Sequence, residues 1–156
     1  MASVVGCKAG TSQSSTPIAA TPPVHTLEGD YLVARDIYMY DPETGGDVLD
    51  GEDSDILSIR KAPNEELNVK IKTVAYNYDQ CYFDQTMTPS GPHQWHWKGG
   101  DMHPGCEVIL AETTTSIVIT SNWDCYHEFC GNRATLEGTF PKAEWRPAGS
   151  YEWPEL

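Results

Sequence analysis

The chain has little positive charge. Ten lysines and arginines stand against 23 aspartates and glutamates, which gives a net charge of −13. Such a protein repels the phosphates of nucleic acids and anionic lipid surfaces, so we expect neither as a partner. The same charge attracts a basic protein and accelerates its encounter, although it also serves simply to keep a secreted protein soluble.

Long apolar runs and catalytic signatures are missing as well. No segment approaches the roughly 18 apolar residues that a membrane span needs. The sequence has no nucleophile elbow, H-E-x-x-H pair, phosphate loop or dinucleotide fingerprint. Carboxylates are plentiful, but no pattern marks one of them as a buried general acid. We therefore predict no enzymatic activity, no catalytic residue and no cofactor.

The length and composition predict one domain with a tail. Hydrophobic residues form 39% of the 156-residue chain and include five tryptophans and eight tyrosines, enough for a sizeable core. Residues 8–23 are rich in Ser, Thr, Ala, Pro and Gly and have no apolar periodicity, which is typical of a flexible tether. We predict a tail over residues 1–23 and a folded domain over residues 24–156.

Short segments with β-branched and aromatic residues predict an all-β fold. The clearest is 67–76, where apolar and polar side chains alternate with a period of two. About eight such strands with close connections favour a single small antiparallel barrel or sandwich. The expected strands are 31–40, 56–61, 67–76, 80–86, 93–98, 107–111, 116–121 and 134–140, with a helical turn near 124–129.

Four of the five cysteines lie in the second half of the chain, at Cys81, Cys106, Cys125 and Cys130. An even set within a compact β-rich stretch predicts two disulfides and an oxidising compartment. Zinc is the alternative, but no C-x2-C pair occurs and the ligands would come from separate strands. We predict no metal site.

The segment Asp41–Asp55 holds seven acidic and no basic residues, and its glycines predict a loop. Together with its surroundings, Leu27–Glu66, it carries nine of the 13 net negative charges. Three interpretations remain open: a solvated loop, a calcium loop, and an acidic surface for a cationic protein. The spacing of the acids does not match an EF-hand loop.

The motif His93-Gln-Trp-His-Trp97 suggests metal binding or stacking at first sight. On a strand, however, His93, Trp95 and Trp97 share one face while His96 points the other way, so the two histidines do not chelate together. Aromatic packing, in the core or at the surface, is the favoured interpretation. A tryptophan-lined ligand groove is the alternative.

Near the N-terminus, Val4-Val5-Gly6-Cys7 resembles a lipobox. This is the site where a bacterial signal peptidase removes the signal peptide, so that the new N-terminal cysteine carries lipid. The resemblance implies lipidation at Cys7. It predicts a lipoprotein anchored to a bacterial membrane and facing the periplasm.

The stretch 55–140 resembles small secreted bacterial domains found among periplasmic lipoproteins, similar in style to lysozyme inhibitors. Four pieces carry the resemblance: Asp55-Ile-Leu-Ser-Ile-Arg60, His93-x5-Gly99, Gly105-Cys106-Glu-Val-Ile-Leu110 and Cys125-x4-Cys130-Gly-Asn-Arg133-Ala-x-Leu136-x-Gly138-x-Phe140. The last piece is the most specific.

Within this resemblance, two disulfide pairings come into question. Cys81–Cys106 with Cys125–Cys130 is preferred, because it closes a local loop around residues 126–129. Cys106–Cys130 with Cys81–Cys125 is the rival. Four cysteines permit three pairings in all.

Charge and resemblance together predict a binding protein that inhibits a basic peptidoglycan hydrolase. The target is a host lysozyme or a competitor's toxin, and in the second case the chain is an immunity protein. The expected partner-binding residues are Asp47, Asp50, Glu52 and Asp53, which steer the partner, and His93 and Arg133, which make specific contacts. The alternative is an envelope domain that binds a small ligand, a glycan or a cation, with Trp95 and Trp97 at the site.

Overall fold

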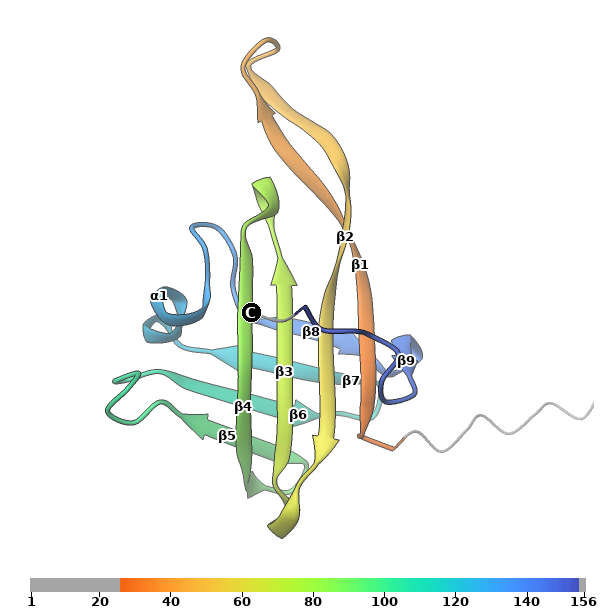
Figure 1. The fold of residues 1–156 in the computed structure, drawn as a ribbon, viewed down its shortest axis with the longest axis vertical. Coiled ribbons are helices and arrows are strands. Elements are labelled where there is room, and N and C mark those ends of the chain that lie inside the picture. Colours follow the sequence, from red (N-terminus) through yellow and green to blue (C-terminus); the bar gives the residue numbers. More distant parts are fainter. Residues whose placement is uncertain (1–25, 155–156) are drawn as a thin grey trace, which may run out of the picture.

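A computed structural model describes residues 26–154, and within them the fold is antiparallel β, as predicted (Figure 1). Nine strands follow one another as neighbours in a single sheet, with β9 added beside β1. The strands are β1 (Gly29–Asp41), β2 (Gly46–Lys61), β3 (Leu67–Val74), β4 (Gln80–Gly91), β5 (Gln94–Lys98), β6 (Glu107–Glu112), β7 (Ser116–Ser121), β8 (Gly138–Pro141) and β9 (Trp145–Arg146).

The two edges of this sheet meet through one short stretch of chain. β8 pairs with β7, and after the 3-10 turn Lys142–Glu144 the chain enters β9, which pairs with β1. The Trp145 indole donates a 3.0 Å hydrogen bond to the Glu28 carbonyl, and Lys142 lies 2.8 Å from Glu112 of β6. The sheet is therefore a nearly closed barrel.

The core lies inside this barrel and follows the alternation of the strands. On β3, Leu67, Val69 and Ile71 are buried while Asn68 is exposed, because successive side chains point to opposite faces. The largest fully buried side chains are Tyr31, Phe83, Phe140, Ile37, Ile56, Leu57, Ile59, Ile71, Met87, Leu110, Ile117 and Ile119.

Two sequence predictions about secondary structure are wrong. The acidic segment is not a loop: only residues 42–45 form a turn, and β2 begins at Gly46 because these residues pair with β1. The expected strand 134–140 begins only at Gly138. Ala134 and Leu136 are buried although they precede the strand, so their alternation reflects a loop that inserts side chains into the core.

Both expected disulfide pairings are wrong as well. The disulfides are Cys81–Cys130 and Cys106–Cys125, the third arrangement that four cysteines permit. The helix α1 (Tyr126–Phe129) separates Cys125 from Cys130, so the two sulfurs meet different strands. Cys130 forms an isolated bridge with the start of β4, and Cys125 lies beside the residue that precedes β6.

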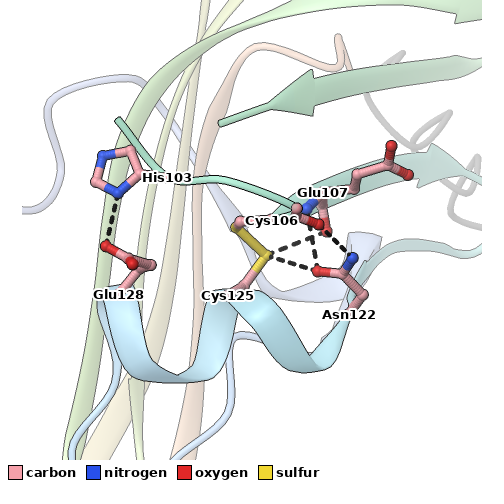
Figure 2. Close-up of a disulfide and its surroundings, with 7 residues drawn as sticks. His103, Cys106, Glu107, Asn122, Cys125 and Glu128 are labelled. Carbon is pink, nitrogen blue, oxygen red and sulfur yellow. Dashed lines mark hydrogen bonds and ion pairs between the residues drawn. A yellow bond between two sulfur atoms is a disulfide. The ribbon is translucent and has the colours of Figure 1, made fainter. Parts of the chain in front are cut away.

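Side-chain contacts fix the segment around Cys106–Cys125 at both ends (Figure 2). The Asn122 amide donates to the Gly105 carbonyl at 2.7 Å and accepts from the Glu107 amide at 3.1 Å. At the other end, His103 lies 2.8 Å from a Glu128 oxygen. The helical segment is therefore held against the loop before β6.

An aromatic cluster fills the gap where β4 and β5 separate. The β4–β5 ladder covers only the end of β4, from Thr88 onward. Beyond it, Phe83 meets Trp97 and Phe129 at ring-centroid distances of 5.3 Å, with nearly perpendicular rings. Edge-to-face pairs of this kind add to the stability that burial provides. This cluster takes the place of strand pairing along that part of the barrel.

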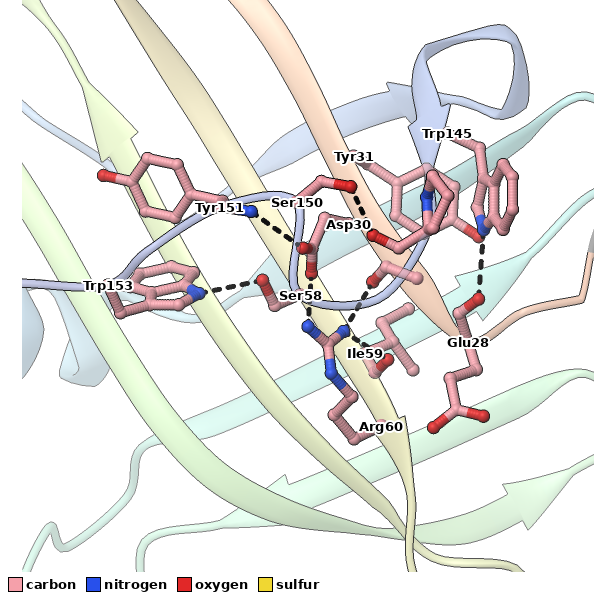
Figure 3. A network of polar contacts seen from close by, with 12 residues as sticks. Glu28, Asp30, Tyr31, Ser58, Ile59, Arg60, Trp145, Ser150, Tyr151 and Trp153 are labelled. Carbon is pink, nitrogen blue, oxygen red and sulfur yellow. Dashed lines mark hydrogen bonds and ion pairs between the residues drawn. The ribbon is translucent and has the colours of Figure 1, made fainter.

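The C-terminal segment crosses the outer face of β1 and β2 (Figure 3). The buried Asp30 carboxylate lies 2.7 Å from the Arg60 guanidinium and accepts a 3.1 Å hydrogen bond from the Tyr151 amide. The Trp153 indole donates to the Ser58 hydroxyl at 2.9 Å. A buried charge requires such partners to remain ionised.

The predicted tail and the lipidation site at Cys7 lie outside the described residues. Among the helices that the structure describes, none has the length and apolar character of a membrane span.

Candidate protein-binding hairpin

The first two strands continue well beyond the rest of the sheet (Figure 1). β2 pairs with β3 only over Ile56–Lys61, and β1 pairs with β9 only at Asp30 and Tyr31. The outer part of the β1–β2 pair, residues 36–52, is therefore a two-stranded ribbon, and none of the other strands that the structure describes lies beside it. We call it the projecting hairpin. An isolated hairpin is only marginally stable in water, so other contacts must support it.

The projecting hairpin exposes large apolar side chains. Tyr40 and Leu49 are 58% and 59% exposed, and Tyr38 and Val48 are 45% and 40% exposed. Tyr38 pairs with Leu49 across the ribbon, so these two side chains share a face. Apolar side chains gathered on a protruding element are typical of an interaction site.

Acidic residues alternate with these apolar side chains. Asp36 lies directly opposite Glu52, and both are exposed and form no ion pair with any residue of the described range 26–154. Like charges directly opposite each other destabilise a strand pair, so this pair favours binding of a cation from outside. At the tip, the Asp41 carboxylate accepts hydrogen bonds from the Glu43 amide and the Thr44 hydroxyl, both at 2.9 Å, which fixes the turn.

Tyr76 ties the projecting hairpin to the barrel. Its hydroxyl donates a 2.7 Å hydrogen bond to Asp47, and the Arg133 guanidinium lies 4.6 Å from its ring centroid. Desolvation and then the hydrogen bond to Asp47 raise the pKa of Tyr76 above its ordinary value. The chain thus places an acid of β2, a tyrosine of the β3–β4 turn and an arginine of the 131–137 loop side by side.

A second tyrosine supports the bulge in the ribbon. The register of β1 and β2 shifts between Ile37 and Tyr38, which leaves Asp50 without a partner residue on β1. Tyr78 hydrogen-bonds to Asp50, and its pKa is raised first by desolvation and then by this bond. The Tyr78 hydroxyl also lies close to Gly51, where an added Cβ would come within 2.6 Å of it. A side chain at position 51 would therefore displace this support.

Ion pairs neutralise the acids at the base of the hairpin. Lys72 lies 2.9 Å from Asp53, and the buried Asp55 lies 2.6 Å from Arg35. A cavity of about 270 Å³ opens beside Asp55, between the hairpin and the loop that carries Thr135. The base is thus electrically balanced, and the unpaired negative charge lies farther out.

The structure brings together four of the six predicted partner-binding residues. Asp47, Asp50 and Glu52 lie on the projecting hairpin, and Arg133 reaches it through Tyr76. Asp53 is at the base and is paired with Lys72. The sixth residue, His93, lies in the β4–β5 turn at the other end of the sheet, 3.2 Å from Glu112. It does not join the others.

The tryptophans of the His93–Trp97 motif take part in packing, which the sequence predicted without deciding between the core and the surface, and the structure places them against the core. Trp95 and Trp97 are both partly buried against the core, and the Trp95 indole donates to the Glu65 carbonyl at 2.9 Å. Across residues 26–154, no three His, Cys, Asp or Glu side chains converge to hold a metal ion.

The sequence pattern does not predict the apolar part of this site. It places two of the exposed apolar residues in a strand and two in an acidic loop, and it gives none of them a role in binding: Tyr38, Tyr40, Val48 and Leu49. The signal in the sequence is that these apolar residues lie near the end of a segment and have polar residues beside them, which indicates exposure. Their exposure follows only from the missing third strand.

Comparison with known proteins does not add to this picture: no family model, curated protein or solved structure matches the chain.

Proposed function

We propose that this domain is a protein-binding inhibitor in the bacterial envelope, whose projecting hairpin contacts a basic peptidoglycan hydrolase of lysozyme type. With a competitor's toxin as the target, it acts as an immunity protein. The observation that supports this most is the combination of exposed apolar and unpaired acidic side chains on one protruding ribbon. The proposed function involves no reaction.

The apolar side chains would supply the central contact. Binding energy at interfaces is concentrated in a few side chains, among which tyrosine and arginine are enriched. Tyr38, Tyr40 and Leu49 are exposed on the ribbon, and Arg133 lies at its foot. A ribbon two strands wide is narrow enough to enter a substrate cleft, where it would exclude the glycan strand.

The acids would steer the partner. Hydrolases of this type are basic around a cleft that holds catalytic carboxylates. Asp36 and Glu52 form no ion pair within the described part of the chain, so they would meet basic side chains on the rim of the cleft. Arg133 would approach the carboxylates. Two disulfides are consistent with a protein that works in an oxidising compartment such as the periplasm, to which lipid at Cys7 would anchor it.

Titration of the folded domain against lysozyme and a panel of wall hydrolases tests the proposal. We expect submicromolar binding, loss of hydrolase activity, and an association rate that falls as salt rises. Tyr40→Ser combined with Leu49→Ser should weaken binding at least roughly tenfold. Binding to no member of the panel would refute the proposal.

Met102→Ser is the matched control. Met102 is 82% exposed and lies outside the projecting hairpin, so its replacement removes a comparable apolar side chain from another surface. Binding should be unchanged. Asp36→Asn combined with Glu52→Gln should slow association and flatten its salt dependence, with little effect on dissociation.

A further inference from the structure

A second hollow lies next to the foot of the projecting hairpin, apart from the exposed apolar and acidic side chains of the ribbon. Its volume is about 470 Å³, within the range of small-ligand sites. Two segments line it: the helical segment that carries Trp123 and Tyr126, and the loop 131–137. The first segment follows Asn122, which is held by hydrogen bonds, and the second follows Cys130, which is held by a disulfide.

Trp123 presents a flat aromatic surface at this hollow. It is 72% exposed, more than any other tryptophan, tyrosine or phenylalanine among residues 26–154. One face of its indole stacks on Tyr126, with ring centroids 5.0 Å apart and planes 8° apart. The His127 ring also contacts the indole, with ring centroids 5.7 Å apart and planes at 88°. Trp123 keeps its large exposed fraction despite these two contacts.

The backbone around Trp123 is held rigidly. Asn122 binds both residues that flank Cys106, and Cys125 forms the disulfide with Cys106 itself (Figure 2). The fixed backbone and the stacking on Tyr126 restrict the indole, so it loses little conformational entropy when a ligand stacks on it. The indole is therefore preorganised although it is exposed.

The opposite wall supplies several polar side chains. The loop 131–137 begins at the disulfide-bonded Cys130, and the Thr73 hydroxyl donates to the Thr135 carbonyl at 2.5 Å. Its polar side chains Asn132 and Glu137 line the hollow and form no hydrogen bond or ion pair within the described chain. Among the described lysines and arginines, two form no ion pair with a carboxylate: Arg133 and Lys61.

We infer that this hollow binds a short pyranose oligosaccharide. The axial C–H groups of a pyranose ring form an apolar face that stacks on an indole, while its hydroxyls project outward as donors and acceptors. An amide, a guanidinium and a carboxylate beside one exposed indole offer both kinds of hydroxyl contact. The net charge of −13 favours a neutral sugar over an anionic one.

Ligand-observed NMR and calorimetry on the folded domain test this inference. The probes are the trisaccharides of N-acetylglucosamine, cellulose and maltose at millimolar concentration. We expect saturation transfer to ring protons of at least one probe, and Trp123→Ala should weaken its binding by roughly tenfold. Because Trp123 is exposed, the variant should keep its melting temperature, and Met102→Ala serves as the surface control.

Binding of none of the three probes would overturn the inference, as would equal binding by Trp123→Ala. The outcome is separable from that of the proposed function. The hairpin variant Tyr40→Ser with Leu49→Ser should bind the sugar as the wild type does and bind the hydrolase more weakly. Trp123→Ala should bind the sugar more weakly whether or not any hydrolase binds.

Discussion

The Tyr76 hydroxyl donates a 2.7 Å hydrogen bond to the carboxylate of Asp47, a residue 29 positions earlier in the chain. This bond joins the turn after β3 to the outer part of the projecting hairpin. Since no third strand supports the hairpin there, its orientation depends on such side-chain contacts.

Tyr76→Phe should loosen the projecting hairpin without unfolding the barrel. The variant keeps the ring under Arg133 but removes the donor to Asp47. We expect amide exchange over residues 38–50 to become roughly fivefold faster, because one hydrogen bond is lost. Exchange in β3 should not change. Tyr151→Phe is the control, and equal protection in both variants would contradict the role of Tyr76.

The same bond should break at high pH. Because the pKa of Tyr76 is raised, its neutral phenol persists above the ordinary tyrosine value near 10. The bond contributes fully below the unfolded-state pKa and is lost as pH rises through the folded-state pKa. Hydrogen-exchange protection of the hairpin should therefore fall above about pH 10 in the wild type. Tyr76→Phe should show a smaller fall, and the part that remains comes from Tyr78, whose pKa is also raised beside Asp50.

Asp30→Asn should destabilise the domain by about 3 kcal/mol, because it leaves Arg60 without its buried counter-ion. Chemical denaturation measures the loss. Asp84→Asn is the control: Asp84 pairs with Lys70 on the surface, where its side chain is 63% exposed, so the cost should stay below about 1 kcal/mol. Similar costs for the two variants would argue against the network in Figure 3.

The buried Asp30 carboxylate should also make the free energy of unfolding fall in acid. Burial alone would raise its pKa, but hydrogen bonds from Ser58, Arg60 and the Tyr151 amide outweigh burial and hold the pKa below its usual value. The contribution of the ionised Asp30 to stability is present above the unfolded-state pKa, near 4, and disappears as pH falls through the lower folded-state pKa. Stability measured across pH 2–5 should therefore fall less steeply in Asp30→Asn.

The disulfides should contribute unequally to stability. Cys81–Cys130 spans 49 positions and Cys106–Cys125 spans 19, so loop-closure entropy predicts about 4 and about 3 kcal/mol. Paired cysteine-to-serine variants measure each contribution. Peptide mapping without reduction should recover these two links, and a Cys125–Cys130 peptide would contradict the fold around α1.

Phe129→Ala should open the aromatic seam between β4 and β5. Phe129 packs on Phe83 and Trp97 but is only partly buried, so the expected cost is about 2 kcal/mol, below that of a fully buried ring. Binding of a hydrophobic dye should increase. Phe129→Leu should recover most of the stability, and an unchanged melting temperature in Phe129→Ala would show that the seam does not depend on this ring.

The sequence by itself determined the fold class and most of the strands. Alternation such as that of Leu67, Val69 and Ile71 depends only on the two-residue period of a strand, which acts locally. The strand 116–121 is predicted with its observed limits, and the placement of Trp95 and Trp97 on one face of their strand follows from the same period.

Tertiary structure decided the cysteine pairing, the acidic segment and the site. Cys81 meets Cys130 because of how α1 lies against β4, a relation between residues 49 positions apart that no local pattern encodes. Gly46–Asp55 is a strand because β1 pairs with it, despite its polar composition. Arg133 and His93 were grouped by chemistry, but the antiparallel order of β3 and β4 puts His93 at the far end of the sheet, since direction reverses with every strand.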